Sequence, residues 1–440
     1  MRDDRALIDA ADPWRHAALP ERVTGLTGLS PGDPCARGVA PGDPVSASTR
    51  ASRRCVRAVF TGLAGPAVSG WRWMSSRLLT AVRALRRPRG RSDAPTRHVA
   101  THAFAAVLAT LLPALVQPAV AQGFAGLGQG GEGFALPARD VPFAFPDDHG
   151  PHPDFRIEWW YLTAVLRDPD GRDYGVQWTL FRSALTPEGP QVWMGHAGIT
   201  TPDAHHTGER LARGGVGQAG VAAAPFRAWI DEWSMAGPDL SRLSVAATAG
   251  AAAYDLDLVA TGPLVAHGEA GFSVKSASGQ ASHYYSQPFY EVTGTLVLPT
   301  GAVEVTGQGW LDREWSSQPL EGDQEGWDWF SLHLEDGHRL MAFVLRGGSP
   351  FDYASWIAPD GEVTAYYGGL TAEPLTTARV AGRDVPVRWR LALPAEGVDL
   401  TVEAVNPDSW QATLFPYWEG PVTATGTHAA RGYLEMTGYE

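Results

Sequence analysis

The segment Arg156-Ile-Glu-Trp-Trp-Tyr-Leu-Thr-Ala-Val-Leu-Arg167 decides the fold class, because it is a continuous run of residues that favour β-strands. Pro169-Asp-Gly171 follows as a tight turn, and residues 174–182 return with apolar and polar positions in alternation. Two such runs joined by a turn predict an antiparallel β-hairpin.

The same order of strand, turn and strand recurs three times further along the chain. It is found at residues 296–306, 327–345 and 356–367, and single strands are expected at 385–393, 399–404 and 420–426. No stretch of comparable length after residue 155 has a helical period. Many short strands with regular turns are typical of a sandwich or a closed up-and-down barrel.

Two parts of the chain, residues 159–182 and 327–346, share one layout. Each opens on an aromatic cluster, turns at Asp-Gly and closes on an apolar stretch that ends in Arg. We interpret this as an internal duplication that divides the β-rich region near residue 320. The sequence therefore predicts an all-β protein with two tandem antiparallel barrel or sandwich domains, at 141–319 and 320–440. Barrels of about eight strands hold one small ligand.

Charge divides the chain differently. Residues 1–100 hold 17 arginines and 8 acidic residues, a net charge of +9, whereas the other 340 residues hold 18 basic and 40 acidic residues, a net charge of −22. We interpret residues 1–100 as a disordered or wrongly assigned basic leader, with translation starting near Met74 or later. The acidic remainder argues against nucleic acid and anionic lipid headgroups as partners.

A secretory signal is predicted at residues 101–121. A short apolar run at 103–116 follows a cluster of arginines and precedes Ala119-Val-Ala121, a small-x-small cleavage site. The run is too short for a stable membrane span. Cleavage after Ala121 would give a periplasmic or secreted protein that begins with a glycine-rich linker at 122–140, and a retained N-terminal anchor is the alternative.

The densest cluster of polar and aromatic residues lies at 307–330. Strand alternation places Asp312 and Glu314 on one face and Leu311, Arg313 and Trp315 on the other. In one interpretation Arg313 forms an ion pair while the tryptophans fill the core. In the other, a carboxyl group beside indole rings stays protonated and acts as an acid, because desolvation raises the pKa of a carboxyl group.

Glu158, beside Trp159 and Tyr161, is a second carboxyl group in an aromatic setting, although a solvated charge at the start of a strand is the alternative. Lys275 is the only lysine in an arginine-rich chain. Either a compact ammonium group is required at this position or Lys275 stands there by chance.

No metal or cofactor site is expected. The histidines have no zinc-ligand spacing, and His196 and His333 lie within strand patterns, where they line a cavity or belong to the core. Residues 126–131 match G-x-G-x-x-G, but neither a strand nor a helix flanks them, so no dinucleotide is expected to bind. No serine of the mature chain has the setting of a triad nucleophile.

Seven ordered motifs resemble the carotenoid 1,2-hydratase (hydroxyneurosporene synthase) superfamily, and within it the AttH-type branch known as predicted secreted hydrolases. The resemblance covers about residues 145–440. The motifs are Glu158-Trp-Trp-Tyr-Leu-Thr163, Gly195-His-Ala197, Pro225-Phe-Arg-Ala-Trp229, Gly271-Phe-Ser-Val-Lys275, Ser282-His-Tyr-Tyr-Ser286, Trp310-Leu-Asp-Arg-Glu-Trp-Ser316 and Gly326-Trp-Asp-Trp-Phe330. The resemblance implies two tandem lipocalin-like domains. Its members include carotenoid hydratases, fungal cyclases and periplasmic proteins associated with ABC exporters of the FtsX-like permease type.

For the hydratase branch, the resemblance implies a site in which an acid protonates an alkene and aromatic rings stabilise the cation. The matching motifs give Asp312, Glu314 and Asp328 as candidate acids. The candidate ligand contacts are Trp310, Trp315, Trp327, Trp329, Glu158, Trp159, Tyr161, His196, Lys275, Tyr285 and His333. We expect Asp312, Trp315 and Trp327 to border one pocket.

Two main hypotheses follow. The first is an exported protein that binds an apolar or amphipathic small molecule, such as a lipid or isoprenoid, as a carrier or as an accessory to an ABC exporter with an FtsX-like permease. The second is a hydro-lyase that adds water to a terminal alkene, as carotenoid 1,2-hydratases do. The third hypothesis is a structural or protein-binding module.

Overall fold

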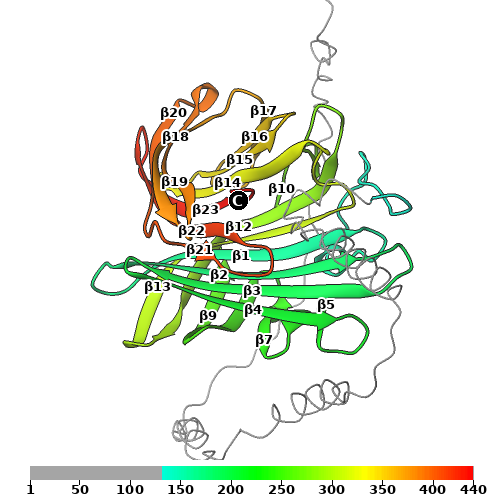
Figure 1. Cartoon of the computed structure of the whole chain (residues 1–440), viewed down its shortest axis with the longest axis horizontal. Helices are drawn as coiled ribbons and strands as arrows, with labels where there is room; N and C mark the ends of the chain where they lie inside the picture. The colour runs from blue at the N-terminus through cyan, green and yellow to red at the C-terminus, as the bar shows by residue number, and fades with distance from the viewer. Residues whose placement is uncertain (1–130, 440) are drawn as a thin grey trace, which may run out of the picture. The chain divides into compact units, whose positions relative to one another are not determined.

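The computed structural model describes residues 131–439, which form two antiparallel β-sheets (Figure 1). The only helical elements among them are two short 3₁₀ turns, η2 (Asp147–His149) and η3 (Pro394–Glu396). Within this range no helix has the length and apolar character to cross a membrane. The predicted leader, the signal region and the first residues of the linker lie outside the described residues.

The first sheet has thirteen strands, which are β1 (Ile157–Arg167), β2 (Asp173–Ala184), β3 (Gln191–Thr201), β4 (Ala204–Arg213), β5 (Ala219–Ala222), β6 (Phe226–Ile230), β7 (Trp233–Asp239), β8 (Arg242–Ala249), β9 (Ala252–Ala260), β10 (Val265–Ala266), β11 (Phe272–Val274), β12 (Ala281–Leu298) and β13 (Gly301–Ser316). The second has ten, which are β14 (Gln324–Leu334), β15 (Arg339–Gly347), β16 (Phe351–Ile357), β17 (Val363–Tyr367), β18 (Thr371–Val380), β19 (Arg383–Leu393), β20 (Val398–Ala404), β21 (Trp410–Gln411), β22 (Tyr417–Gly426) and β23 (Ala430–Met436).

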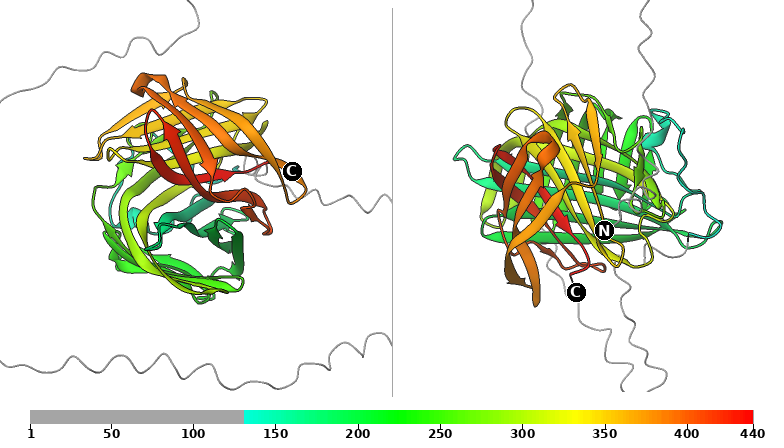
Figure 2. Two further views of the ribbon diagram at one scale, coloured as in Figure 1. Left: turned by 90° about the vertical axis from the view of Figure 1, so that its left-hand side faces the viewer. Right: turned by 90° about the horizontal axis from the view of Figure 1, so that it is seen from above.

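Both sheets follow the same strand order. The first runs β4-β3-β2-β1-β13-β12-β9-β8-β7-β6-β5 and the second β17-β16-β15-β14-β23-β22-β20-β19-β18. In each, four strands form a meander and the last strand of the sheet then pairs with the first, so β1 and β14 occupy equivalent places. Each sheet curls on itself (Figure 2), and in the first sheet β3 and β4 pack against β6 and β8 across the curl.

The predicted all-β, lipocalin-like fold is confirmed, including its hairpins. The β1–β2 hairpin pairs Leu162 with Trp178 and turns through Gly171, whose φ of 83° lies in the left-handed region that glycine favours. The β12–β13, β14–β15 and β16–β17 pairs match the other three predicted hairpins. The chain passes from the first sheet to the second between Ser316 and Gln324.

Strand β1 is buried on both faces. Trp160 and Leu162 point into the core of the first sheet, whereas Tyr161 and Val165 point the other way, into a cluster shared with Trp329 and other side chains of the second sheet. Because both faces are covered, β1 is an almost continuous apolar run rather than a clean alternation. The side chains of β13 divide in the same way, which places the β1–β13 pair between two layers of the protein.

A buried ionic network joins the start of β1 to the ends of β2 and β13. Glu158 is fully buried and forms ion pairs with Arg182 and, at 2.6 Å, with Arg313. The Glu158 carboxylate also accepts a hydrogen bond from the His152 backbone N–H at 2.9 Å. Burial opposes ionisation of Glu158, but Arg313, His152 and Arg182 outweigh it and lower its pKa to about 2.

Arg313 therefore forms an ion pair, as one interpretation expects, and the alternative of a solvated charge at Glu158 is wrong. Arg313 also lies over the Trp160 ring at 3.8 Å from its centroid and donates to the backbone oxygen of Gly150. The sequence did not show that two guanidinium groups converge on one carboxylate here.

Replacing Glu158 with Gln should destabilise the protein, because it leaves two guanidinium groups buried without a negative partner. The expected loss in the free energy of unfolding at pH 7 is about 3–5 kcal/mol, measured by urea denaturation. The pKa of Glu158 is depressed, so the stability it contributes is present above its ordinary pKa of 4.5 and is lost as the pH falls toward 2.

The matched control is Asp399→Asn, which breaks an exposed ion pair with Arg390 on the second sheet and should change stability little. An E158Q variant as stable as the wild type at pH 7 would show that the network does not hold β1 and β13 together.

Candidate functional site

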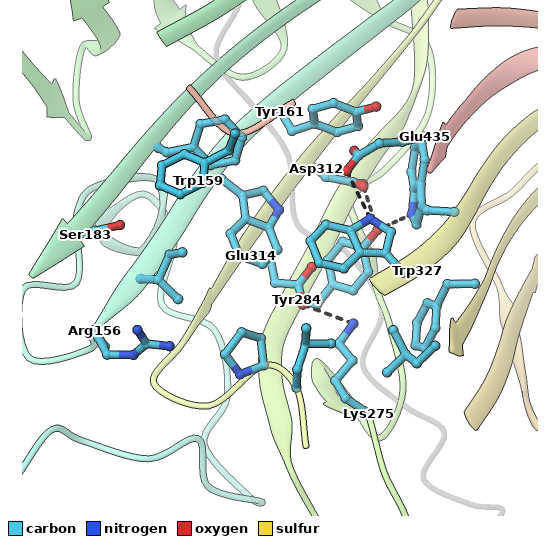
Figure 3. A pocket seen from close by; sticks show the side chains of 18 of the residues that line it. Arg156, Trp159, Tyr161, Ser183, Lys275, Tyr284, Asp312, Glu314, Trp327 and Glu435 are labelled. Atoms are coloured by element: carbon cyan, nitrogen blue, oxygen red, sulfur yellow. Dashed lines mark hydrogen bonds and ion pairs between the residues drawn. The ribbon is translucent and has the colours of Figure 1, made fainter. Parts of the chain in front are cut away.

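A cavity of about 480 Å³ lies between the two sheets, and we call it the junction pocket (Figure 3). Its apolar wall consists of Ile157, Trp159, Tyr161, Phe181, Leu185, Met194, Pro319, Leu320, Trp327, Trp329, Phe343, Leu345 and Phe415. Its polar groups come from Arg156, Ser183, Lys275, Tyr284, Asp312, Glu314 and Glu435. The first sheet contributes residues of β1, β2, β3, β12 and β13 to the lining of the pocket, and the second sheet contributes residues of β14, β15 and β23.

Asp312 is the most enclosed carboxyl group of the pocket. It accepts hydrogen bonds from the Tyr284 hydroxyl and the Trp310 indole N–H, both at 2.6 Å, and from the Ser286 hydroxyl. Burial raises its pKa to about 7, although these three hydrogen bonds act in the opposite direction. A carboxyl group with this pKa exchanges its proton near neutral pH, as a general acid or base must.

Glu314, two residues further on the same face of β13, carries a cationic partner instead. The Lys275 ammonium lies 3.0 Å from its carboxylate, and the Ser282 hydroxyl donates to it as well. The ammonium also lies over the rings of Tyr284 and Phe343, at 4.8 and 4.2 Å from their centroids. A compact ammonium fits between two ring faces and a carboxylate, which favours a requirement for lysine at this position over chance.

Two carboxyl groups of the second sheet were not among the candidates that the sequence identified. Glu435 on β23 borders the pocket and accepts a hydrogen bond from the Trp327 indole N–H at 3.0 Å. Glu419 on β22 lies directly opposite Glu435 in the strand pairing and is fully buried. Burial raises the pKa of Glu435 to about 7. Burial, and next to it the charge of Glu435, raises that of Glu419 well above its ordinary value.

A signal for these two residues was present in the sequence. Each is the only acidic residue of a strand that is otherwise mostly apolar, Tyr417-Trp-Glu-Gly-Pro-Val422 and Tyr433-Leu-Glu-Met436. The sequence could not show that the face carrying them turns toward the first sheet.

Several candidates lie on the opposite faces of their strands. Glu158, Trp315 and Tyr285 point into the first sheet, where Trp315 stacks on His152 with ring centroids 3.9 Å apart and Tyr285 lies 2.7 Å from the His149 ring nitrogen. The expectation that Trp315 borders the pocket with Asp312 and Trp327 is therefore wrong for Trp315, because strand alternation turns it away.

Asp328 lies on the face of β14 that points into the second sheet. It pairs with Arg346 at 3.0 Å and accepts a hydrogen bond from the Tyr439 hydroxyl at 3.0 Å. Burial raises its pKa to about 6, with Arg346 opposing. Because it does not border the pocket, the structure does not bring Asp328 together with Asp312 and Glu314.

Three further candidates are buried near the pocket without lining it. Trp310 touches Asp312 through its indole N–H, and His333 packs against the Trp310 ring, with the ring centroids 5.9 Å apart. His196 lies 3.0 Å from the Tyr417 hydroxyl and 3.4 Å from Glu209. The candidates that do line the pocket are Trp159, Tyr161, Lys275, Asp312, Glu314, Trp327 and Trp329.

Across residues 131–439, no three His, Cys, Asp or Glu side chains are grouped so that they could hold a metal ion. The arrangement is instead an aromatic cavity with carboxyl groups of raised pKa on two walls. Such a cavity can bind an apolar molecule and exchange protons with it.

Comparisons with known proteins agree with this architecture. The family model described as AttH-like matches residues 136–439. A structure described as an AttH from Nitrosomonas europaea is 32% identical, covers 70% of this chain and 99% of its own, and has a TM-score of 0.64. Kievitone hydratase from Nectria haematococca is 16% identical, with 70% and 96% covered and a TM-score of 0.54, and shares the fold.

A search of curated proteins gave no match. The family match spans both sheets and every residue of the junction pocket, and the relative from N. europaea is similar over nearly its whole length. This chain belongs to the AttH-like family.

Proposed function

We propose that this protein binds an apolar or amphipathic small molecule in the junction pocket. The observation that carries the proposal is the composition of the wall, in which aromatic and aliphatic side chains surround a small number of convergent polar groups. Pockets that bind small molecules commonly have this composition and a volume of roughly 300–1,000 Å³.

The size of the pocket limits the ligand. A cavity of about 480 Å³ encloses a short isoprenoid or lipid chain, or one end of a longer molecule such as an acyclic carotenoid. The ammonium of Lys275 and the carboxyl groups of the pocket provide polar contacts for a hydroxyl or similar head group.

Replacing Trp159 with Ala should weaken binding, because its partly buried ring belongs to the apolar wall. Native mass spectrometry with geranylgeraniol as the probe should show an affinity lower by about tenfold, corresponding to about 1.4 kcal/mol.

Trp229→Ala is the matched control, because Trp229 lies on β6, is similarly exposed and does not border the pocket. Equal affinities of W159A and W229A would mean that the ligand binds elsewhere.

The carboxyl groups favour a second, more specific function, the addition of water to a terminal alkene. Asp312, protonated below pH 7, would donate a proton to the alkene carbon, and the indole rings of Trp327 and Trp329 would face the resulting tertiary cation. Carboxyl groups with perturbed pKa values are concentrated at functional sites. A neighbour in fold, kievitone hydratase, is named as a hydratase, which agrees with this proposal.

Replacing Asp312 with Asn should abolish turnover of geranylgeraniol or an acyclic carotenoid, with a loss of about 10²–10⁴-fold, because an amide cannot supply the proton. The wild-type rate should fall as the pH rises through about 7, since the raised pKa of Asp312 keeps the acid form below that value. The measurement is product formation by liquid chromatography and mass spectrometry.

Asp336→Asn serves as the control, because Asp336 is exposed beyond the end of β14. Bound ligand that remains chemically unchanged with the wild type would favour a carrier over an enzyme.

We further propose that the protein acts in the periplasm or outside the cell, and that it serves an ABC exporter with an FtsX-like permease if it is a carrier. Support comes from the apolar run at 103–116, the cleavage motif that ends at Ala121 and the binding pocket.

The N-terminus of the protein purified from its own cells tests the export proposal. Edman or mass-spectrometric sequencing should find a mature chain that starts at Gln122. A mature N-terminus before residue 100 would contradict both the predicted cleavage and the late translation start.

A further inference from the structure

The two walls of the junction pocket each carry a carboxyl group that has no cationic partner among the described residues. Asp312 projects from β13 of the first sheet, and Glu435 projects from β23 of the second (Figure 3). Ion pairs hold two other buried acids of this region, Glu314 with Lys275 and Asp328 with Arg346, and Glu419 is buried beside Glu435 without lining the pocket. Asp312 and Glu435 are therefore the two acids that border the pocket without a cation among the described residues.

The protonation states of Glu435 and Glu419 depend on each other. The two residues are direct partners on neighbouring antiparallel strands, so their side chains leave the same face of the sheet next to each other. Two negative charges at this separation in a buried setting are unfavourable, and such a pair shares a proton.

The contacts indicate which member of the pair carries the negative charge. Glu435 is only partly buried and accepts the Trp327 indole N–H at 3.0 Å, and both features favour its ionised form. Glu419 is fully buried, and this desolvation outweighs its contacts with the Tyr417 hydroxyl and with the Gln411 amide, the latter long at 3.5 Å. The proton of the pair therefore resides on Glu419, and Glu435 faces the pocket as a carboxylate.

The Tyr161 hydroxyl group lies beside this pair. Tyr161 is 4% exposed and borders the pocket, and its hydroxyl approaches the carboxyl groups of Glu419 and Glu435. Within residues 131–439, no group forms a hydrogen bond of normal geometry with this hydroxyl. A buried hydroxyl at a pocket wall that has no hydrogen bond of normal geometry can bind a ligand atom or a water molecule.

We propose that Glu435 is a second acid–base residue of the pocket, which accepts a proton from the water that adds to the substrate, and that the Tyr161 hydroxyl positions this water. The proposal rests on the hydratase function proposed above. It assigns to the second sheet a chemical role that no sequence motif indicated.

The reaction balances with these groups. Asp312 gives its proton to one alkene carbon and becomes a carboxylate, and the other carbon becomes a tertiary cation. The water oxygen bonds to that cation, and one water proton passes to the Glu435 carboxylate, which leaves a tertiary alcohol. A second water molecule returns the proton from Glu435 to Asp312, so both groups regain their starting forms.

Glu435 meets several titratable groups on the strands packed around it. They are Glu419 and Tyr417 on β22, Tyr161 on β1, and Asp312 and Glu314 on β13, with Lys275 paired to Glu314. Because Glu419 carries the proton of the pair, the negative charge near Glu435 comes from Glu314 and from Asp312 once it has given up its proton, and both raise the pKa of Glu435.

Kinetics of geranylgeraniol hydration as a function of pH test the proposal. Glu435→Gln should lower kcat by about 10²-fold or more and leave KM within about threefold, and it should remove the fall in rate at low pH that protonation of the base causes. Glu419→Gln, which replaces a protonated carboxyl group with a neutral amide, should keep most of the activity and leave that fall in place. Glu403→Gln, an exposed change on β20 of the same sheet, should leave the profile unchanged.

Tyr161→Phe provides a variant that removes only the hydroxyl group and keeps the ring in the wall. It should lower kcat without weakening geranylgeraniol binding measured by native mass spectrometry, which separates positioning of water from packing. If E435Q and Y161F both turn over the probe at the wild-type rate, this assignment is wrong, whereas the hydratase function stands. If the wild type binds the probe but converts none of it to product, both the hydratase function and this assignment are wrong.

Discussion

The burial of the β1–β13 strand pair on both faces is the constraint on which the rest of the structure depends. One face packs into the curl of the first sheet and the other meets the second sheet, so the side chains of residues 157–166 and 309–316 lie in one of two interiors. A shift of one residue in register would exchange the two sets. The pairing of Tyr161 with Asp312 thus places both on the pocket face, and Trp160 and Arg313 on the other.

The same constraint separates two kinds of buried charge. On the inner face, Glu158 is neutralised by two guanidinium groups and stays ionised, and there it holds strands together. On the pocket face, Asp312 and Glu435 have hydrogen-bond donors but no cation of their own, so burial raises their pKa values into the neutral range. Structural and chemically available carboxyl groups on these strands thus differ by whether a cationic side chain faces them, as Lys275 faces Glu314.

Local patterns in the sequence predicted most of the fold and one wall of the site. Turn residues such as Gly171, and the alternation around Asp312 and Glu314, depend on interactions between residues that are close in the sequence. Such interactions can be inferred from a single sequence. Glu419 and Glu435 could not be assigned, because their role depends on one sheet docking on another. For the same reason Glu158 and Trp315 were placed with the ligand: the sequence shows that they belong to an aromatic strand but not which interior each one faces.

Lys275 has a consequence for covalent chemistry. It is the only lysine in the 440 residues, and its ammonium lies in the wall of the pocket, 93% of its side chain covered. A reagent that acylates amines therefore has a single side-chain target in the whole chain. The α-amino group at the N-terminus is the other amine that such a reagent meets, and a group attached to Lys275 would lie against the Tyr284 and Phe343 rings, inside the cavity.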